Sequence, residues 1–549
     1  MPDGRTPTRP RPWVWFVLAG LFLGLSVWGL GLARSQDAAK TTLWWFALGG
    51  GLLALGRQWS GRTAARIWWL LCLVFGLDNA VQGVVRGFFG AFPQPGVIAE
   101  ALANTTPSES WDFVLGQRGP IALGALYWVL WWVIGLLGSR AWRTATPPVH
   151  SRKRWGLLAL LLAFAGLLHA NPSMLGHEPF LRWGVVYMRH QQAREEMQNL
   201  VAARQALWAE RAQWQARLDN DRAATVVVFI GESGNRMNWG LYGYPRDTTA
   251  PLAQAFQALG GQTLLFTQAR STQAFTLPSL RLALTPADEA QPQLWQSTPD
   301  FVLLARAAGY HVRWLSNQPG QDGWLASLAR GADEHVFINS GNWRDSSTED
   351  DDLLPVLRQK LQASTPTHEL IVVHLLGQHF HYALRCGKQA GPFGRVTSDA
   401  VMQALQAQGR SAGIRQARND YDDATYCGAR SVARLLQEVA GARADRAVRA
   451  LYFSDHGQEV GHQRDFAGHS ERDESGYTVP LWVWSNALAR PLSAQHLNAP
   501  VRLDTLEQAL QTLMGLRSRW YLPSQDFLSP QYAPPRTGRP SGSVSGSVG

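Results

Sequence analysis

Two short apolar segments, far apart in the chain, each lead into residues that can bind a metal ion. Residues 226–230 lead into Glu232, and residues 451–453 lead into Asp455 and His456. Apolar runs of this length, rich in β-branched and aromatic residues, are typical of buried parallel strands. In an open α/β sheet, ligands bind beyond the carboxyl ends of the strands. If the two strands are neighbours, the three side chains form an O,O,N set that suits Zn²⁺ with one position open for chemistry.

Glu232 and the residues after it also fit other local structures. Glu232 could be an acid at the N-terminus of a helix, with Ser233 as the capping residue. The segment 231–235 is not a nucleophile elbow, because the G-x-S-x-G pattern requires glycine where Asn235 stands.

Histidines and a glycine accompany the second motif. Gly457 follows His456 and gives the backbone the freedom for the tight turn that two adjacent metal ligands need. His462, His469 and the upstream His379 add candidate ligands or phosphate-binding donors. The H-E-x-x-H pattern of zincin helices is absent around them. For each histidine alone, a surface position or a hydrogen-bonded core position is an equal alternative.

Group transfer at such a site needs a nucleophile, and a hydroxyl is a good candidate because Zn²⁺ lowers its pKa and positions it. The segment 269–278 follows a predicted strand at 264–267 and offers Ser271, Thr272 and Thr276. Ser271 and Thr272 lie nearer the strand end, where we expect the metal. Thr276 lies further along, within or beyond a helical turn. All three are also common as turn or capping residues.

The segments that must position these residues alternate between two patterns. Strand-like runs occur at 224–230, 264–267, 311–315, 370–374, 450–453 and 479–484. Helical segments occur at 300–308, 351–362, 422–439 and 504–513. This alternation predicts a mostly parallel sheet covered by helices on both faces.

The N-terminal part of the chain instead contains five apolar segments close to membrane-spanning length. They lie at 13–32, 42–55, 67–84, 121–137 and 155–168. The second and the last are short for a hydrocarbon core about 30 Å thick, so we expect their helices to extend into flanking residues. Aromatic residues near the segment ends predict interfacial belts. They are Trp44, Trp45, Trp68, Trp69, Tyr127, Trp131 and Trp132.

Basic residues predict the orientation of these spans. Arginine and lysine concentrate before the first span, after the second, and between the fourth and fifth. The positive-inside rule then places the N-terminus in the cytoplasm, and an odd number of spans exports the C-terminal domain, which in a bacterium means the periplasm. The net charge of +10 is therefore largely a topology signal. It does not indicate nucleic-acid binding, because the soluble part has no basic helix and no aromatic–basic interleaving.

The chain is expected to divide into four regions. They are a membrane domain at 1–171, amphipathic bridging helices at 172–223, an exported α/β catalytic domain at 224–533 and a disordered Pro/Gly/Ser-rich tail at 534–549. Three cysteines are too few for a disulfide framework. Cys72 lies in a predicted span, whereas Cys386 and Cys427 form either one bridge or two unpaired thiols.

Several further motifs follow one another in the order found in a known family. They are GES at 231–233, LYGYPRDTT at 241–249, IVVHLLGQH at 371–379, NDYDD at 419–423, YFSDHG at 452–457 and YTVP at 477–480. The chain thus resembles the bacterial phosphoethanolamine transferases of lipopolysaccharide, membrane members of the alkaline phosphatase/sulfatase superfamily. The resemblance covers nearly the whole chain and is closest to the branch that modifies core heptose.

The resemblance implies roles for particular residues. The zinc ligands of the family fall on Glu232, Asp455 and His456. Its threonine nucleophile, which also contacts zinc, falls on Thr272. In the family this threonine precedes an aromatic-hydroxyl-aliphatic-proline run, which here lies at 275–278, and this chain has one more residue between the two than the family has. Thr276, inside that run, is the fallback.

The resemblance also implies contacts with the substrates. Histidines that bind phosphate or a second zinc ion fall on His379 and His469. The donor head group is expected at Glu100 and Asn104, in the exported loop after the third span.

The function implied is a two-step transfer that uses one or two Zn²⁺ ions. The threonine takes phosphoethanolamine from phosphatidylethanolamine and passes it to a hydroxyl of lipopolysaccharide, on core heptose or lipid A. Transfer to another periplasmic glycan stays open. A membrane-tethered hydrolase, either a phosphodiesterase or a sulfatase, is the main alternative, although the sulfatase motif C/S-x-P-x-R is absent. A non-catalytic sensor on the same scaffold is the third hypothesis.

Overall fold

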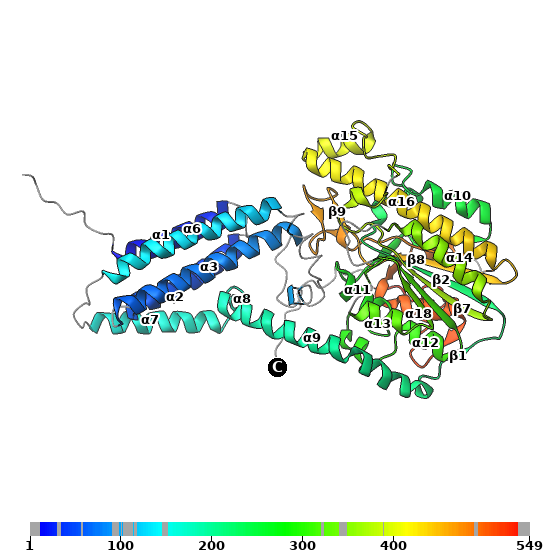
Figure 1. Ribbon diagram of the computed structural model, residues 1–549, viewed down its shortest axis with the longest axis horizontal. Coiled ribbons are helices and arrows are strands. Elements are labelled where there is room, and N and C mark those ends of the chain that lie inside the picture. Colours follow the sequence, from blue (N-terminus) through cyan, green and yellow to red (C-terminus); the bar gives the residue numbers. More distant parts are fainter. Residues whose placement is uncertain are drawn as a thin grey trace, which may run out of the picture. The chain divides into compact units, whose positions relative to one another are not determined.

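The computed structural model describes residues 11–29, 35–55, 59–89, 98–99, 102, 114, 118–144, 152–319, 323–339, 348–387, 389–487 and 492–535. The chain forms two compact units, shown in Figure 1. One comprises Met1–Thr105 and Ser110–Glu195, and the other comprises Thr106–Glu109 and Glu196–Gly549. The division falls inside the predicted bridging segment. Most of the predicted tail lies outside the described residues.

The first unit is helical where the five apolar segments were predicted. Its long helices are α1 (Pro12–Gly29), α2 (Ser35–Leu55), α3 (Gly61–Phe89), α6 (Arg118–Arg143) and α7 (Arg152–His169). The second helix reaches 21 residues by extending upstream of the apolar run, as expected. Within the described residues, two stretches are long and apolar enough to cross a membrane, Gly61–Val85 and Arg118–Arg143. The apolar stretches Pro12–Leu25 and Leu158–His169 are shorter.

Many of the aromatic residues predicted near the span ends pack between the helices of this unit, and the interfacial belts stay a prediction. The side chains of Trp45, Trp68 and Trp131 are fully buried. The Trp45 ring packs edge-to-face on Trp68 at 5.6 Å and on Trp131 at 5.2 Å between centroids. Trp44 and Tyr127 are buried as well, whereas Trp132 is exposed. Edge-to-face contacts of this kind stabilise helix packing beyond the area that they bury.

Two helices follow in the segment predicted to bridge the two parts. They are α8 (Pro172–Leu175) and α9 (Pro179–Ala209). Near the start of α9, Arg182 Nη1 lies 3.0 Å from Asp78 Oδ2 of α3, and both side chains are buried. Breaking a buried ion pair leaves an uncompensated charge, which is strongly destabilising. This pair therefore fixes the first turn of α9 against α3.

The second unit contains a seven-stranded sheet in the order β3-β11-β8-β2-β7-β5-β6. The strands are β2 (Ala224–Gly231), β3 (Gln262–Leu265), β5 (His311–Ser316), β6 (Glu334–Phe337), β7 (His368–His374), β8 (Ala447–Ser454) and β11 (Leu481–Ser485). β8, β2, β7, β5 and β6 are parallel, and β11 is antiparallel to both β8 and β3. The predicted α/β fold with a mostly parallel sheet is confirmed.

Alternate residues of the central strand enter different cores, one on each face of the sheet. Val226 and Val228 belong to a cluster with helices α11 (Thr276–Ala283), α12 (Phe301–Ala307), α13 (Trp324–Arg330) and α18 (Leu506–Met514). Val227 and Phe229 belong to a second cluster with α10 (Ala250–Leu259), α14 (Leu353–Ala363) and α16 (Ala412–Ala442). Figure 1 shows these helices on the two faces. Two apolar faces explain why β2 is apolar without interruption from Val226 to Ile230.

Helix α18 carries a buried acid whose protonation couples folding to pH. Burial raises the pKa of Glu507 from 4.5 to about 8. The unfolded chain loses this proton near pH 4.5, so the contribution of Glu507 to stability falls as pH rises from about 4.5 to 8. In Glu507→Gln the amide replaces the protonated carboxyl, and we expect a melting temperature similar to wild type at pH 5 but several degrees higher at pH 8. Thermal unfolding of the purified chain measures both values, and equal shifts at the two pH values would contradict the assignment.

Candidate active site

Two adjacent strands bring the predicted metal ligands together. β2 pairs with β8 in parallel, and Gly231 lies opposite Ser454 in the register. Glu232 therefore leaves one strand end beside the residues Asp455 and His456 that leave the other. The neighbour relation assumed from the sequence is confirmed.

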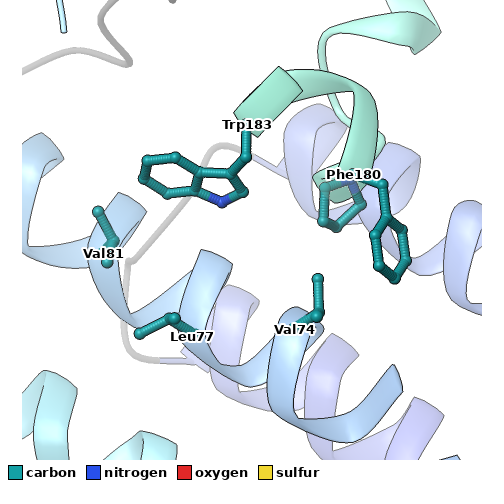
Figure 2. A pocket seen from close by; sticks show the side chains of 6 residues that line it. Val74, Leu77, Val81, Phe180 and Trp183 are labelled. Atoms are coloured by element: carbon teal, nitrogen blue, oxygen red, sulfur yellow. The ribbon is translucent and has the colours of Figure 1, made fainter. Parts of the chain in front are cut away.

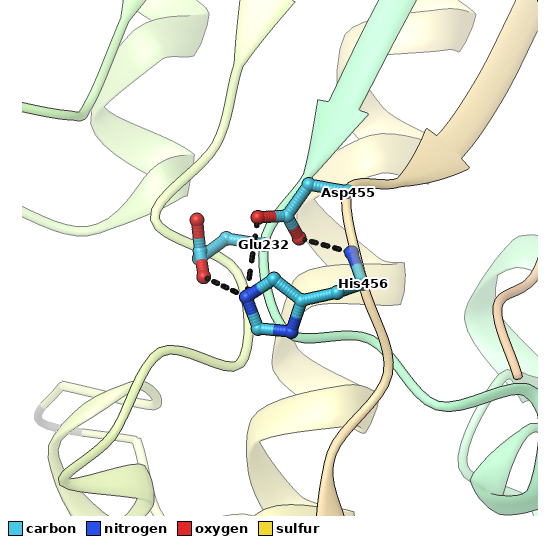
Figure 3. A group of neighbouring side chains, drawn as sticks. All are labelled: Glu232, Asp455 and His456. Atoms are coloured by element: carbon cyan, nitrogen blue, oxygen red, sulfur yellow. Dashed lines mark hydrogen bonds and ion pairs between the residues drawn. The ribbon is translucent and has the colours of Figure 1, made fainter. Parts of the chain in front are cut away.

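The three side chains form one buried cluster at this edge of the sheet. Their ligand atoms all lie within 4.8 Å of one another. His456 Nε2 lies 3.5 Å from Glu232 Oε1 and 3.4 Å from Asp455 Oδ2. Figure 3 shows the imidazole between the two carboxylates.

Hydrogen bonds to the backbone orient His456 and Asp455. His456 Nδ1 lies 2.7 Å from the Gly457 carbonyl oxygen, so a proton on Nδ1 leaves the lone pair of Nε2 directed toward the carboxylates. Asp455 Oδ1 accepts hydrogen bonds from the backbone N–H groups of Ser233 at 2.9 Å and His456 at 2.8 Å. Side chains that bind a metal typically make such hydrogen bonds through the atom that does not bind the metal. These hydrogen bonds fix the orientation of the side chain.

Close charges shift the pKa of every member of the cluster. Burial, reinforced by the Glu232 carboxylate, raises the pKa of Asp455 to about 6. Burial opposes charge on His456, but Asp455 and Glu232 outweigh it and raise the pKa of this imidazole to about 9. Burial likewise opposes charge on Glu232, yet the hydrogen bond from His456 lowers its pKa overall. Two buried carboxylates around one imidazole form a strongly cation-attracting centre.

The cluster fits a zinc ion by its donor set and by one orphaned atom. Asp455 Oδ2 is buried and accepts no hydrogen bond from any described residue. A buried carboxylate oxygen without a donor is costly unless a cation satisfies it. Two carboxylates and one imidazole are ligands that Zn²⁺ takes in catalytic sites, with a fourth position left for a substrate or nucleophile.

The hydroxyl next to this cluster belongs to Thr276. Its Oγ1 lies 3.3 Å from Glu232 Oε2 and 3.4 Å from His456 Nε2. Phe275 is extended, and α11 begins at Thr276, so the hydroxyl stands at the first residue of the helix. Ser279, one turn further on, donates to the Asp455 carbonyl oxygen and ties this helix to the end of β8.

Thr272, the nucleophile implied by the resemblance, shows no hydrogen bond to the cluster among the described residues. Its Oγ1 is buried and has no hydrogen-bond partner there. The turn before α11 explains the difference, because the Ser271 N–H donates to Tyr477 and the Ser271 hydroxyl to the Gln273 carbonyl. Residues 273–275 connect this turn to Thr276, whose hydroxyl lies beside the cluster. The geometry favours Thr276 as the hydroxyl beside the cluster, and the choice of nucleophile between Thr272 and Thr276 stays a prediction.

Two of the predicted substrate-binding histidines lie close to His456. The rings of His456 and His469 are 4.6 Å apart between centroids, and Phe275 stacks on His469 at 5.7 Å. Burial, together with the positive charges of Arg385 and His456, lowers the pKa of His379 to about 3. Burial and His456 also lower the pKa of His469. Both imidazoles are thus held neutral beside the cluster.

The remaining predicted site residues have other places. His462 Nε2 lies 2.8 Å from the Asn238 side-chain oxygen, outside the cluster. Glu100 and Asn104 lie outside the residues that the structure describes.

Ser233 shows a strained backbone that the sequence analysis did not predict. Its φ is +56°, a left-handed value that is uncommon for serine. This conformation lets its N–H reach Asp455 Oδ1 while its hydroxyl donates to Glu232 Oε1 at 2.8 Å. Strain of this kind persists where the surrounding structure fixes it, often at functional sites. Ser233 therefore connects two of the metal ligands.

Gly457 is needed for a close approach and not for a left-handed turn, in contrast to the sequence-based expectation. No positive φ is found at this residue. A Cβ atom there would lie 2.1 Å from the Ser475 carbonyl oxygen and 2.8 Å from that of Thr478. The turn that carries Asp455 and His456 could then no longer pack on the segment behind it.

In Gly457→Ala, we expect the affinity for zinc to fall at least about tenfold, because the clash moves two ligands. Gly413→Ala is the matched control, since its added Cβ would meet no atom within 4 Å in α16. A zinc titration of both purified variants against a competing chelator measures the effect. Equal affinities would show that the packing at Gly457 does not position the ligands.

The YGYPRDTT and NDYDD motifs form a support beneath the site. Arg246 Nη1 donates to Asp422 Oδ2 at 2.6 Å. The neighbouring Tyr421 hydroxyl donates to the Ser233 carbonyl at 2.6 Å and accepts from the Asn235 N–H at 2.7 Å. A network of this kind fixes the backbone on which Glu232 stands.

Cys386 and Cys427 form a disulfide, which decides between the two alternatives left open by the sequence. Cys427 lies on α16, and Cys386 lies in the loop that follows β7 and contains His379. The bridge therefore ties the histidine-bearing loop to a helix. Cys72 is a free, buried thiol.

Comparison with known proteins supports the fold. The Sulfatase family profile matches residues 224–516. The chain is 29% identical over 319 residues to the phosphoethanolamine transferase EptC of Escherichia coli (strain K12), covering 56% of this chain and 54% of that protein. It is 28% identical over 323 residues to the phosphoethanolamine transferase CptA of Salmonella typhimurium, covering 57% and 54%. The chain thus spans about half the length of these curated relatives.

Solved structures show the same architecture. The zinc complex of the periplasmic domain of Escherichia coli EptC superposes with a TM-score of 0.54 and 27% identity, over 60% of this chain and 93% of that one. The integral membrane protein EptA of Neisseria meningitidis, a lipooligosaccharide phosphoethanolamine transferase, gives a TM-score of 0.58 and 16% identity, over 94% and 98%. That likeness concerns the fold of both units. The chain belongs to the sulfatase family, and within it is similar to phosphoethanolamine transferases.

Proposed function

We propose that the chain is a membrane-anchored phosphoethanolamine transferase that uses phosphatidylethanolamine as donor and lipopolysaccharide as acceptor. The observation that carries the proposal is the contact of the Thr276 hydroxyl with Glu232 and His456 in a buried ligand set. The similarity to the phosphoethanolamine transferases EptC and CptA supports phosphoethanolamine as the group that is transferred. The resemblance to the core-heptose branch favours heptose over lipid A as the acceptor site.

The residues of this chain act in two displacements at phosphorus. Thr276 Oγ1 attacks the phosphorus of the donor, and its proton passes to Glu232 Oε2, the nearest carboxylate oxygen at 3.3 Å. The bond from phosphorus to the glyceride oxygen breaks, and that oxygen takes up a proton and leaves on diacylglycerol. An acceptor hydroxyl then attacks the phosphorus of the phosphothreonine, the bond from phosphorus to Thr276 Oγ1 breaks, and the proton that the acceptor loses restores the Thr276 hydroxyl.

Electrostatic stabilisation accounts for most of the rate enhancement in such a reaction. Zn²⁺ held by Glu232, Asp455 and His456 would lower the pKa of the Thr276 hydroxyl and offset charge on the phosphoryl oxygens. His379 and His469 are kept neutral by burial beside the cluster, where the resemblance implies contact with phosphate or with a second zinc ion.

We further propose that the first unit anchors the enzyme in the bacterial inner membrane and that the second unit acts in the periplasm. Helices α6 and α7 expose large apolar side chains, such as Leu123 at 68% and Leu167 at 71%. Contiguous apolar surface of this kind is unfavourable in water and typical of lipid contact. The Cys386–Cys427 disulfide supports an oxidising compartment.

Transfer by the purified full chain tests the proposal. With a fluorescent phosphatidylethanolamine and lipopolysaccharide in mixed micelles, we expect diacylglycerol to form together with lipopolysaccharide that is heavier by one phosphoethanolamine. Fragment mass spectrometry assigns the modified sugar. Release of free phosphoethanolamine at the same rate without acceptor would instead identify a hydrolase.

A further inference from the structure

The first unit has an apolar groove between α3 and α9, which Figure 2 shows with the side chains that line it. Nothing in the described part of the chain shows what covers this groove. The second unit contains a feature whose contacts do lead to a proposed function, the buried carboxylate of Asp350.

The loop that follows β7, residues 375–379, lies against the backbone of a proposed metal ligand. The Gln378 N–H donates to the Glu232 carbonyl oxygen at 2.9 Å, and the Leu375 N–H donates to the Ile230 carbonyl oxygen at 3.0 Å. The loop also carries His379. Its position therefore affects both Glu232 and a proposed phosphate-binding residue.

Gly377 is the residue of this loop that approaches Glu232 most closely. Its φ is +55°, and a Cβ atom there would lie 2.8 Å from both the backbone nitrogen and the carbonyl oxygen of Glu232. No side chain fits between the two backbones at this point. A displacement of the loop therefore displaces Glu232 or breaks its hydrogen bond with Gln378.

The Asp350 carboxylate accepts two hydrogen bonds from the backbone of this loop. Its Oδ1 accepts from the Leu376 N–H at 2.8 Å, and its Oδ2 accepts from the Gly377 N–H at 3.0 Å. Asp350 begins the 3₁₀ helix η5 (Asp350–Asp352) and is 9% exposed. Hydrogen bonds from N–H groups to a carboxylate are stronger than those between neutral groups.

The end of the neighbouring strand joins the same carboxylate. Asn317 directly follows β5, and its side-chain amide donates to Asp350 Oδ1 at 2.9 Å. The Asn317 N–H donates to the carbonyl oxygen of His374, the last residue of β7, at 2.9 Å. The carboxylate thus fixes the start of the loop to two adjacent strands.

We propose that Asp350 is a positioning residue of the active site, which holds the loop 375–379 against Glu232 and thereby fixes Glu232 for metal binding. The inference rests on the metal site of the proposed function but not on the identity of the donor or the acceptor. Loss of groups that orient metal ligands typically lowers metal affinity about 10–100-fold.

The zinc affinity of the purified full chain, measured against a competing chelator, tests the proposal. In Asp350→Asn the amide nitrogen replaces one of the two acceptors, and we expect the affinity to fall at least about tenfold. Gly377→Ala displaces the same loop without changing any charge, and we expect a fall of similar size. A residue that only stabilises the fold would instead lower the melting temperature and leave zinc affinity unchanged.

Hydrogen–deuterium exchange of the metal-free protein gives a second measurement that needs neither zinc nor transfer. In both variants we expect faster exchange at residues 375–379 than in wild type. Exchange at wild-type rates in this loop would show that Asp350 does not hold it, and would overturn the proposal.

Asp351→Asn is the matched control, because it removes the same charge from the next residue. Asp351 pairs with Arg434 of α16 at 2.7 Å, and within the described part of the chain it makes no hydrogen bond to the loop. A partly exposed ion pair contributes little, so we expect wild-type zinc affinity in this variant.

The outcomes separate position from charge. Weaker zinc binding in Asp350→Asn but not in Gly377→Ala would show that the charge of Asp350 acts and not its hold on the loop, and would overturn the proposal. Wild-type affinity in both variants would overturn it as well. If Asp350→Asn does not fold, Gly377→Ala decides alone. A wild-type chain that binds zinc but transfers no phosphoethanolamine would count only against the proposed function.

Discussion

Thr276→Ala is expected to abolish transfer while Thr272→Ala keeps it. The Thr276 hydroxyl contacts Glu232 and His456, whereas the Thr272 hydroxyl has no hydrogen-bond partner among the described residues. Loss of a covalent nucleophile costs at least about 10³-fold in turnover. Diacylglycerol release from a fluorescent donor measures both variants. Intact-protein mass spectrometry without acceptor is expected to find a phosphoethanolamine adduct in wild type and Thr272→Ala, and none in Thr276→Ala.

The two threonines provide their own control, because both are buried or half-buried on the same short segment. Thr276→Ser keeps a hydroxyl at the helix start and is expected to retain part of the activity. The same zinc content in all three variants would show that the alanine changes chemistry and not metal binding. If Thr272→Ala is inactive and Thr276→Ala carries the adduct, the nucleophile is Thr272 and the start of α11 shifts when substrate binds.

The metal ligands could be predicted from sequence because their positions depend on strand ends alone. Glu232, Asp455 and His456 each follow an apolar run, and parallel strands end at one edge of a sheet. The hydroxyl could not be fixed in this way, since Ser271, Thr272 and Thr276 share one short segment and the turn before α11 decides which of them lies beside the cluster. Pro278 was the available signal. Pro278 lies in the first turn of the helix, where the backbone N–H groups have no acceptor within the helix, so proline is tolerated there. A proline at this position therefore indicates that the helix begins just before it.

The elements missed from sequence are those that depend on tertiary partners. β4 (Gln268–Arg270) and β12 (Pro500–Arg502) form a separate two-stranded sheet, and neither has the long apolar run of a core strand. The N-terminal part of α16 is polar, so its apolar pattern indicates only the later turns. The sequence also does not show whether a tryptophan ring faces lipid head groups or packs on another ring. In the first unit, the Trp45 ring packs on the rings of Trp68 and Trp131.

Glu232→Gln is expected to remove zinc and activity together. The amide keeps the shape of the side chain and can still accept from Ser233, but it takes away the negative charge and the proposed proton acceptor of Thr276. Because changes outside the ligand shell already cost 10–100-fold in metal affinity, we expect losing a ligand to cost at least about 100-fold. Elemental analysis of the purified protein measures zinc, and a chelator followed by added zinc is expected to restore wild type but not the variant.

Glu507→Gln makes the same substitution at another buried glutamate, on α18 and outside the cluster. It is expected to keep both zinc and transfer, which separates the loss of a metal ligand from the general effect of neutralising a buried acid. If Glu232→Gln binds zinc as tightly as wild type, the ion does not use this carboxylate. Glu232 would then act only through its contact with Thr276, and the variant would lose turnover at unchanged metal content.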